Sequence, residues 1–108
     1  MEAMSESTFN RHIDATLLAI EEALDAASAD IDYENTGGIL TLHCSGGSQV
    51  ILNRQTPVRQ LWLAARSGGF HFDWDEAAEG WVRDSDQTPL AQVLSEILAT
   101  QCGEDVTL

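Results

Sequence analysis

The stretch ILTLHC-SGGS-QVILN, residues 39–53, has the pattern of a β-hairpin. Two runs rich in aliphatic residues flank a turn that contains Gly46 and Gly47. Short runs of this kind, separated by paired glycines, are typical of antiparallel strands joined by tight turns. The pattern continues on both sides and predicts further strands over 30–34, 60–65, 70–74 and 81–83. We therefore expect an antiparallel sheet of five or six strands.

Two segments with helical periodicity lie outside this sheet. From about Ser7 to Ala27, apolar residues recur at intervals of three or four, as on one face of a helix. A second apolar stripe follows Pro89, with Thr88 as the expected N-cap, and Gly103 is expected to end that helix. Amphipathic helices need an apolar surface to cover. The sequence thus predicts an α+β two-layer sandwich, with the N- and C-terminal helices on one face of the sheet.

Length and composition restrict the class of protein. A chain of 108 residues that is 44% apolar fits one domain over residues 1–108. The longest strictly apolar run, 61–65, is too short to span a membrane, and the first six residues lack the features of a secretory signal. We therefore expect a cytoplasmic protein. In that reducing compartment, Cys44 and Cys102 are expected to be free thiols.

The charge is strongly acidic and unevenly distributed. Eighteen carboxylates against five arginines and lysines give a formal net charge of −13. Such a charge disfavours nucleic acids and anionic lipids, and it favours cations and basic protein surfaces. Residues 37–72 contain no acidic residue, so all the carboxylates lie in the first and last thirds of the chain.

An acidic flank is expected along the first helix and the strand that follows it. The carboxylates on this flank are Asp14, Glu21, Glu22, Asp25, Asp30, Asp32 and Glu34. Those on the helix lie outside its apolar face and have no basic residue four positions later. Those on the strand alternate, so we expect them to point to one side and adjoin the helix. Uncompensated oxygens attract hard cations and basic proteins. This spacing leaves three interpretations open: a solvated surface, a weak cation site and a protein-docking surface.

Strand parity singles out Trp62. Leu61 and Leu63 point to one face of their strand, and Trp62 points to the other. If the leucines lie under the helices, Trp62 stands on the open face, where we expect Arg54 and Arg59 beside it. Tryptophan and arginine are common interface anchors, so this position fits a protein-docking site. Packing of Trp62 against a neighbouring loop is the alternative.

A conventional active site is not expected. The paired glycines sit in hairpin-like turns, and they do not form a phosphate-binding loop. His43 and His71 lie on expected strands without a serine or cysteine nucleophile in register. These features favour a protein that is not an enzyme.

The run NRQTPVRQLWLA, residues 53–64, followed by GGFHF at 68–72, resembles the frataxin family, specifically its bacterial CyaY-type members. The likeness extends to residues 20–25 and 30–32 and covers nearly the whole chain. The resemblance implies the frataxin fold. It also implies a non-enzymatic, iron-binding accessory that regulates iron–sulfur cluster assembly by binding a cysteine desulfurase and its scaffold protein, with iron donation as a further implied role.

The resemblance also implies site residues. The family's acidic ridge, which binds Fe²⁺ or Fe³⁺ weakly and meets the basic desulfurase, corresponds to Glu21, Glu22, Asp25, Asp30, Asp32 and Glu34; these six are called the acidic ridge below. Asn53, Gln60 and Trp62 match the sheet-face residues used toward the partner complex. Glu21, Glu22 and Asp25 are expected to bind that partner as well as metal.

Three alanines depart from the family pattern. Ala26, Ala27 and Ala29 stand where bacterial relatives often carry further acids, which implies fewer or weaker metal sites. Two alternatives to the accessory role stay open. One is a ferroxidase-type enzyme that oxidises bound Fe²⁺, and the other is an acidic adaptor that uses no metal. A monomer is expected in each case.

Overall fold

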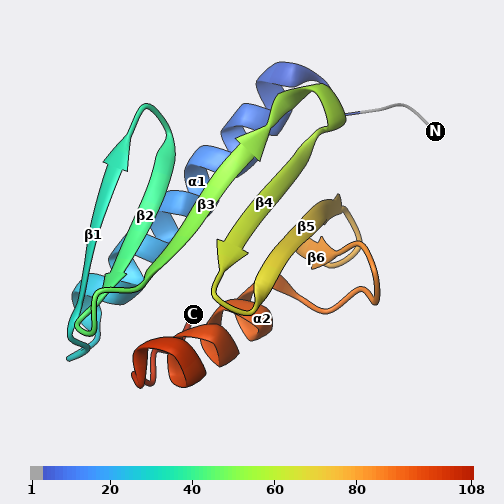
Figure 1. Cartoon of the computed structure of the whole chain (residues 1–108). Helices are drawn as coiled ribbons and strands as arrows, with labels where there is room; N and C mark the ends of the chain where they lie inside the picture. The colour runs from blue at the N-terminus through green and yellow to red at the C-terminus, as the bar shows by residue number, and fades with distance from the viewer. Residues whose placement is uncertain (1–3) are drawn as a thin grey trace.

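A computed structural model describes residues 4–108 and shows two helices and a six-stranded antiparallel sheet (Figure 1). The strands form a meander in the order β1-β2-β3-β4-β5-β6, which leaves β1 and β6 at the edges. The elements are α1 (Glu6–Ala26), β1 (Ile31–Thr36), β2 (Ile39–Cys44), β3 (Gln49–Gln55), η1 (Thr56–Val58), β4 (Gln60–Ala65), β5 (Gly68–Asp75), β6 (Gly80–Arg83), α2 (Leu90–Ile97) and η2 (Leu98–Cys102).

The apolar stripe expected on the first helix is the face that α1 buries. Ser5 caps this helix, since its side-chain oxygen accepts a hydrogen bond from the Thr8 amide at 3.2 Å. The buried residues of α1 are Phe9, Ile13, Leu17, Ile20 and Leu24. They share one cluster with the buried side chains of the sheet and of α2. The predicted two-layer α+β arrangement is confirmed, with both helices on the same face of the sheet.

The sheet contributes its inward residues as rows across the strands. Leu40 on β2 lies opposite Leu52 on β3, and Leu52 lies opposite Leu63 on β4. All three are almost completely buried. Burying one such aliphatic side chain stabilises a fold by about 1.5–3 kcal/mol, so this row fixes the register of the central strands.

Element boundaries differ from the sequence expectation at several ends. β3 continues to Gln55, past the residue where the hairpin pattern stops, because its pairing with β4 continues to that residue. α2 begins at Leu90 with Pro89, and not Thr88, as the N-cap residue. The Thr88 amide instead donates to Asp86 at 3.1 Å. Gly103 ends the helical segment with a positive φ of 69°, as expected.

The expectation of two free thiols is wrong. Cys44 and Cys102 form a disulfide, with their Cα atoms 5.0 Å apart. Fifty-eight positions separate them in the sequence, and the packing of η2 against the end of β2 brings them together. No local spacing could reveal this contact.

No helix within residues 4–108 has the length and apolar character needed to cross a membrane. The expectation that the first six residues lack the features of a secretory signal rests partly on Met1 to Ala3, which lie outside the described portion.

Candidate functional site

Two carboxylates of the acidic ridge, Glu21 and Asp25, lie on the flank of α1 that faces the edge strand β1. Glu21 accepts a hydrogen bond from the Asn35 side-chain amide at 3.1 Å. Both oxygens of Asp25 lie within 2.9 Å of the Tyr33 hydroxyl, which donates to them. This hydrogen bond raises the pKa of Tyr33 above its usual value of 10.0. Glu22 is exposed. Two neutral donors from β1 therefore hold this flank, and neither of them is a basic side chain.

The remaining strand carboxylates lie on the other side of β1. Ile31 is buried on the side of the helices, so alternation places Tyr33 on that side as well. Asp32 and Glu34 consequently point to the open face of the sheet. Glu34 there lies 3.1 Å from the Nε2 atom of His43 on β2. The expectation that helix and strand carboxylates adjoin directly is wrong, because inward-facing β1 side chains stand between them.

Asp30 occupies the entrance to β1 and meets the C-terminal segment. Its backbone amide donates to the Oε1 atom of Glu104 at 2.6 Å. Glu104 therefore adds a carboxylate at this end of the acidic ridge. Sequence reasoning missed this residue because the return of the chain end to the start of β1 leaves no local signal.

The carboxylates of the acidic ridge have few basic partners among the described residues. Within residues 4–108, none of its six carboxylates forms an ion pair with arginine, and Glu34 alone contacts a histidine side chain, that of His43. Arg54 instead pairs with Asp14 at 2.5 Å, farther toward the start of α1. No three metal-ligating side chains converge in this part of the chain. A cation at the ridge would therefore be held by one or two carboxylates and by its own water molecules.

Trp62 stands on the open face of the sheet, as strand parity predicts. Leu61 and Leu63 on either side of it are buried, whereas Trp62 is half-buried. Its ring stacks on that of His71, with centroids 4.3 Å apart, so a neighbouring strand supports it and not a loop. Its indole N–H donates to Gln60 at 2.9 Å. These contacts fix the orientation of the ring.

The other residues of this surface extend the arrangement. Asn53 on β3 lies directly opposite Trp62 in the strand register. The Gln60 amide donates to Asp73 at 3.0 Å, and this hydrogen bond links β4 to β5. We call Asn53, Gln60, Trp62 and His71 the sheet-face patch. The structure brings all three predicted sheet-face residues together, and it adds His71. The pairing of β4 with β5 places His71 opposite Trp62, so a predicted strand register could have identified it.

The arginines expected beside Trp62 lie elsewhere. Arg54 shares the parity of the buried residues of β3, so it points toward α1 and donates to Asn10 at 2.8 Å. Arg59 donates to the backbone carbonyls of Met4 and Thr56. Both guanidinium groups thus hold the start of α1, and they are not part of the sheet-face patch. The expectation of a basic surface around Trp62 is wrong.

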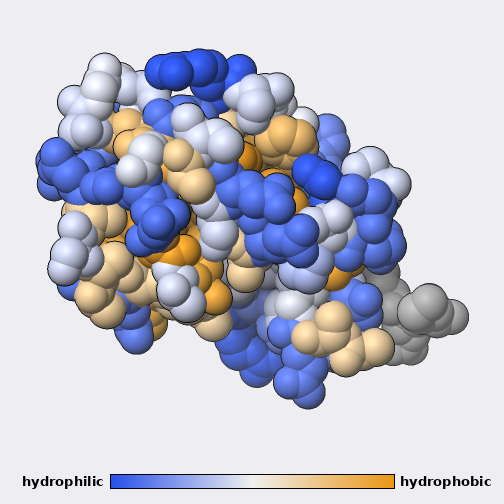
Figure 2. All heavy atoms as spheres, turned by 90° about the horizontal axis from the view of Figure 1, so that it is seen from below, coloured by the Kyte–Doolittle hydropathy of each residue, from blue (hydrophilic) through white to orange (hydrophobic). Residues whose placement is uncertain are grey.

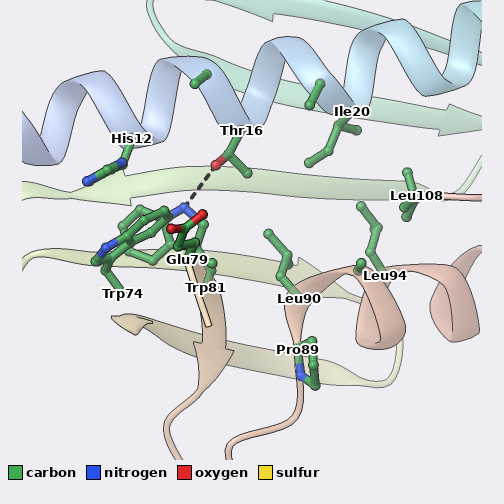
Figure 3. A pocket seen from close by; sticks show the side chains of 14 residues that line it. His12, Thr16, Ile20, Trp74, Glu79, Trp81, Pro89, Leu90, Leu94 and Leu108 are labelled. Atoms are coloured by element: carbon green, nitrogen blue, oxygen red, sulfur yellow. Dashed lines mark hydrogen bonds between the residues drawn. The ribbon is translucent and has the colours of Figure 1, made fainter. Parts of the chain in front are cut away.

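A separate cleft of about 400 Å³ lies between the two helices near the end of β5 (Figure 3). Trp74, Trp81 and Leu94 are among its lining residues, and His12 stacks on Trp74 with ring centroids 3.7 Å apart. The surface seen from below carries apolar side chains gathered between hydrophilic ones (Figure 2). None of the predicted site residues lines this cleft.

The family model for the frataxin-like domain matches residues 2–104. A protein of Pseudomonas aeruginosa named "Iron-sulfur cluster assembly protein CyaY" is 50% identical over 103 residues, which cover 95% of each chain. The protein of the same name from Ectopseudomonas mendocina is 46% identical and covers 96% of this chain and 94% of its own.

Solved structures agree with this match. The frataxin of Psychromonas ingrahamii superimposes with a TM-score of 0.89 at 33% identity, over 95% of this chain and 96% of that one. A trimeric yeast frataxin complexed with ferrous iron reaches a TM-score of 0.67 at 28% identity, over 96% of this chain and 91% of that one. The chain described here therefore belongs to the frataxin family, and its curated relatives are bacterial iron–sulfur cluster assembly proteins of the CyaY type.

Proposed function

We propose that this single-domain protein is a non-enzymatic, iron-binding accessory that regulates iron–sulfur cluster assembly. In this proposal it binds the cysteine desulfurase and its scaffold protein through the acidic ridge and the sheet-face patch. One observation carries the proposal: the six carboxylates lie on α1, at the entrance to β1 and on β1, and none of them is paired with an arginine. That count covers residues 4–108.

Iron enters this proposal as cargo. Carboxylate oxygens suit hard cations, and the exposed positions of Glu22, Asp32 and Glu34 leave room for a hydrated ion. The scarcity of converging ligands supports weak binding, from which iron could be passed to the scaffold. Ala26, Ala27 and Ala29 extend no carboxylate toward this surface, which further limits the amount of iron bound.

Protein docking requires less precise geometry than metal binding. A basic partner responds to charge summed over the whole acidic ridge, so dispersed carboxylates still accelerate and orient association. The sheet-face patch would then fix the final orientation through the Trp62 ring and the amides beside it. The two surfaces have different functions in this scheme, long-range attraction and short-range fit.

A metal-independent acidic adaptor is the second candidate. It is favoured by one observation, that no three metal-ligating side chains converge within residues 4–108. Such an adaptor would bind the partner complex equally well with and without iron. The cytoplasmic location and the monomeric state stay predictions in both cases.

The test compares amide chemical-shift maps during separate titrations with ferrous iron, under anaerobic conditions, and with the desulfurase. The variant E21K/E22K/D25K changes the charge by six units on the α1 flank. The matched control E79K/E96K/D105K makes the same change on exposed residues elsewhere. We expect both ligands to perturb the acidic ridge of the wild type, and we expect the first variant alone to lose desulfurase binding at low salt.

The outcomes separate the candidates. Unchanged desulfurase binding by E21K/E22K/D25K, with its spectrum still that of a folded protein, would contradict the docking proposal. Desulfurase binding without any iron-induced shift or broadening at the ridge would favour the metal-independent adaptor.

A further inference from the structure

The disulfide joins the end of β2 to the end of η2. Cys44 is the last residue of β2 and is 5% exposed, whereas Cys102 ends η2 and is half-buried. Gly103 follows at once and turns the chain with a positive φ. The covalent bond therefore fixes the point from which the C-terminal segment, residues 103–108, departs.

The residues on either side of Cys102 make specific contacts. Just before the disulfide, the Gln101 amide donates to Ser48 and to the carbonyl of Gln49, each at 3.0 Å. Just after it, Glu104 accepts the hydrogen bond from the Asp30 amide. The segment thus reaches the entrance of β1, where the acidic ridge passes from α1 to the sheet.

We propose that Cys44 and Cys102 form a reversible thiol–disulfide exchange site that controls how firmly the C-terminal segment holds the start of β1. A cross-link over 58 positions restricts the unfolded chain strongly, so its reduction lowers the free energy of any opening that separates η2 from β2. Glu104 is the residue after the disulfide that contacts the entrance of β1. This inference rests on the disulfide and its neighbours, and it holds whether or not the proposed function is correct.

The reacting partner is a low-molecular-weight thiol of the glutathione class. Its thiolate attacks the Sγ atom of Cys102, the more exposed sulfur, and Cys44 leaves as a thiolate. A second thiolate attacks the glutathione sulfur of the mixed disulfide and releases Cys102. Two glutathione molecules are oxidised to one glutathione disulfide, and the protein disulfide receives the two electrons. Glutathione disulfide drives the reverse reaction.

The experiment equilibrates the full chain in mixtures of reduced and oxidised glutathione. Thiol labelling with mass spectrometry gives the redox state, thermal melting gives the stability, and hydrogen exchange by NMR follows the Asp30 amide. We expect reduction to lower Tm by about 10 °C or more. We also expect the Asp30 amide to exchange about tenfold faster in the reduced form, because local opening then requires less free energy.

Two variants keep the test decisive. The Asp30 amide of C44A/C102A should exchange at the rate of the reduced wild type, and this rate should not respond to glutathione. This variant also gives the exchange rate without the disulfide if the reduced wild type does not stay folded. E104Q should speed exchange at Asp30 while leaving the disulfide able to form. The proposal is overturned if folded protein keeps two free thiols under oxidised glutathione. It is equally overturned if Asp30 exchanges at the same rate in the oxidised wild type and in C44A/C102A.

Discussion

The acidic ridge and the sheet-face patch differ in how their side chains are held. In the ridge, charged groups stand in solvent and touch few partners, and Tyr33 and Asn35 anchor only two of them. In the patch, Trp62 is stacked on His71 and hydrogen-bonded to Gln60. Strand β1, which carries Asp32 and Glu34, and strand β4, which carries Trp62, are about 14 Å apart across the sheet at the usual strand spacing.

This difference indicates a division of roles. Charges in solvent act over a distance, add to one another and tolerate individual losses, but salt screens them. A fixed aromatic ring acts only on contact, and removing it affects the complex at one point. The ridge should therefore control how fast the partner arrives, and the patch should control how long it stays.

Among single substitutions, the largest expected effect is that of W62A on the partner complex. Loss of a central tryptophan at an interface costs about 2 kcal/mol or more, so desulfurase affinity should fall about thirtyfold, mostly through faster dissociation. Surface plasmon resonance with immobilised desulfurase would measure both rates.

Two further variants control that experiment. W62F keeps a ring to stack on His71 and should recover part of the affinity, whereas T41A changes the same face two strands away and should have little effect. An unchanged dissociation rate in W62A would assign the patch a structural role only, and the contrast with the ridge would not hold.

Salt should distinguish the acidic ridge from the sheet-face patch through the association rate, with a smaller effect than that of W62A on affinity. Raising the ionic strength from about 0.1 M to about 1 M shortens the screening length from about 10 Å to about 3 Å. We expect the wild-type association rate to fall about tenfold over that range. W62A should show the same dependence on salt, and E22Q a weaker one. Stopped-flow fluorescence would give the rates, and equal salt dependence in wild type and E22Q would argue against steering by the ridge.

The fold could be predicted from sequence because its determinants are local. The period of four and three residues in α1 and the alternation of Leu61, Trp62 and Leu63 each specify which side faces the core. The sequence-based predictions fail where segments distant in the chain meet. The pairing of Cys44 with Cys102 and the contact of Glu104 with Asp30 depend on where the chain end packs.

The site was predicted in composition more accurately than in arrangement. Counting charges identified the carboxylates, and parity placed Trp62 correctly. The same parity, applied to Tyr33 and Arg54, would have shown that Tyr33 separates the helix and strand carboxylates and that Arg54 points inward. The orientations of Tyr33 and Arg54 are thus encoded locally, whereas the contact of Glu104 with Asp30 depends on distant packing.

The smallest expected effect concerns how β1 holds the helical flank of the ridge. Tyr33 is the single tyrosine of the chain, so the ultraviolet absorbance of tyrosinate reports it alone. Its hydrogen bond to Asp25 favours the neutral phenol, and the titration midpoint should lie above 10.0. D25N should return the midpoint to about 10, and E22Q should leave it unchanged.

The sign of the corresponding stability effect follows from that shift. A phenol with a raised pKa in the folded state stabilises the fold fully below pH 10, and this contribution disappears as the pH rises through the folded pKa. Alkaline melting curves of wild type and Y33F should therefore converge above that pH. If D25N leaves the Tyr33 midpoint in place, the phenol does not hold Asp25. The ridge would then lack its firmest anchor to β1, and its carboxylates would differ from the sheet-face patch even more than the hydrogen bonds indicate.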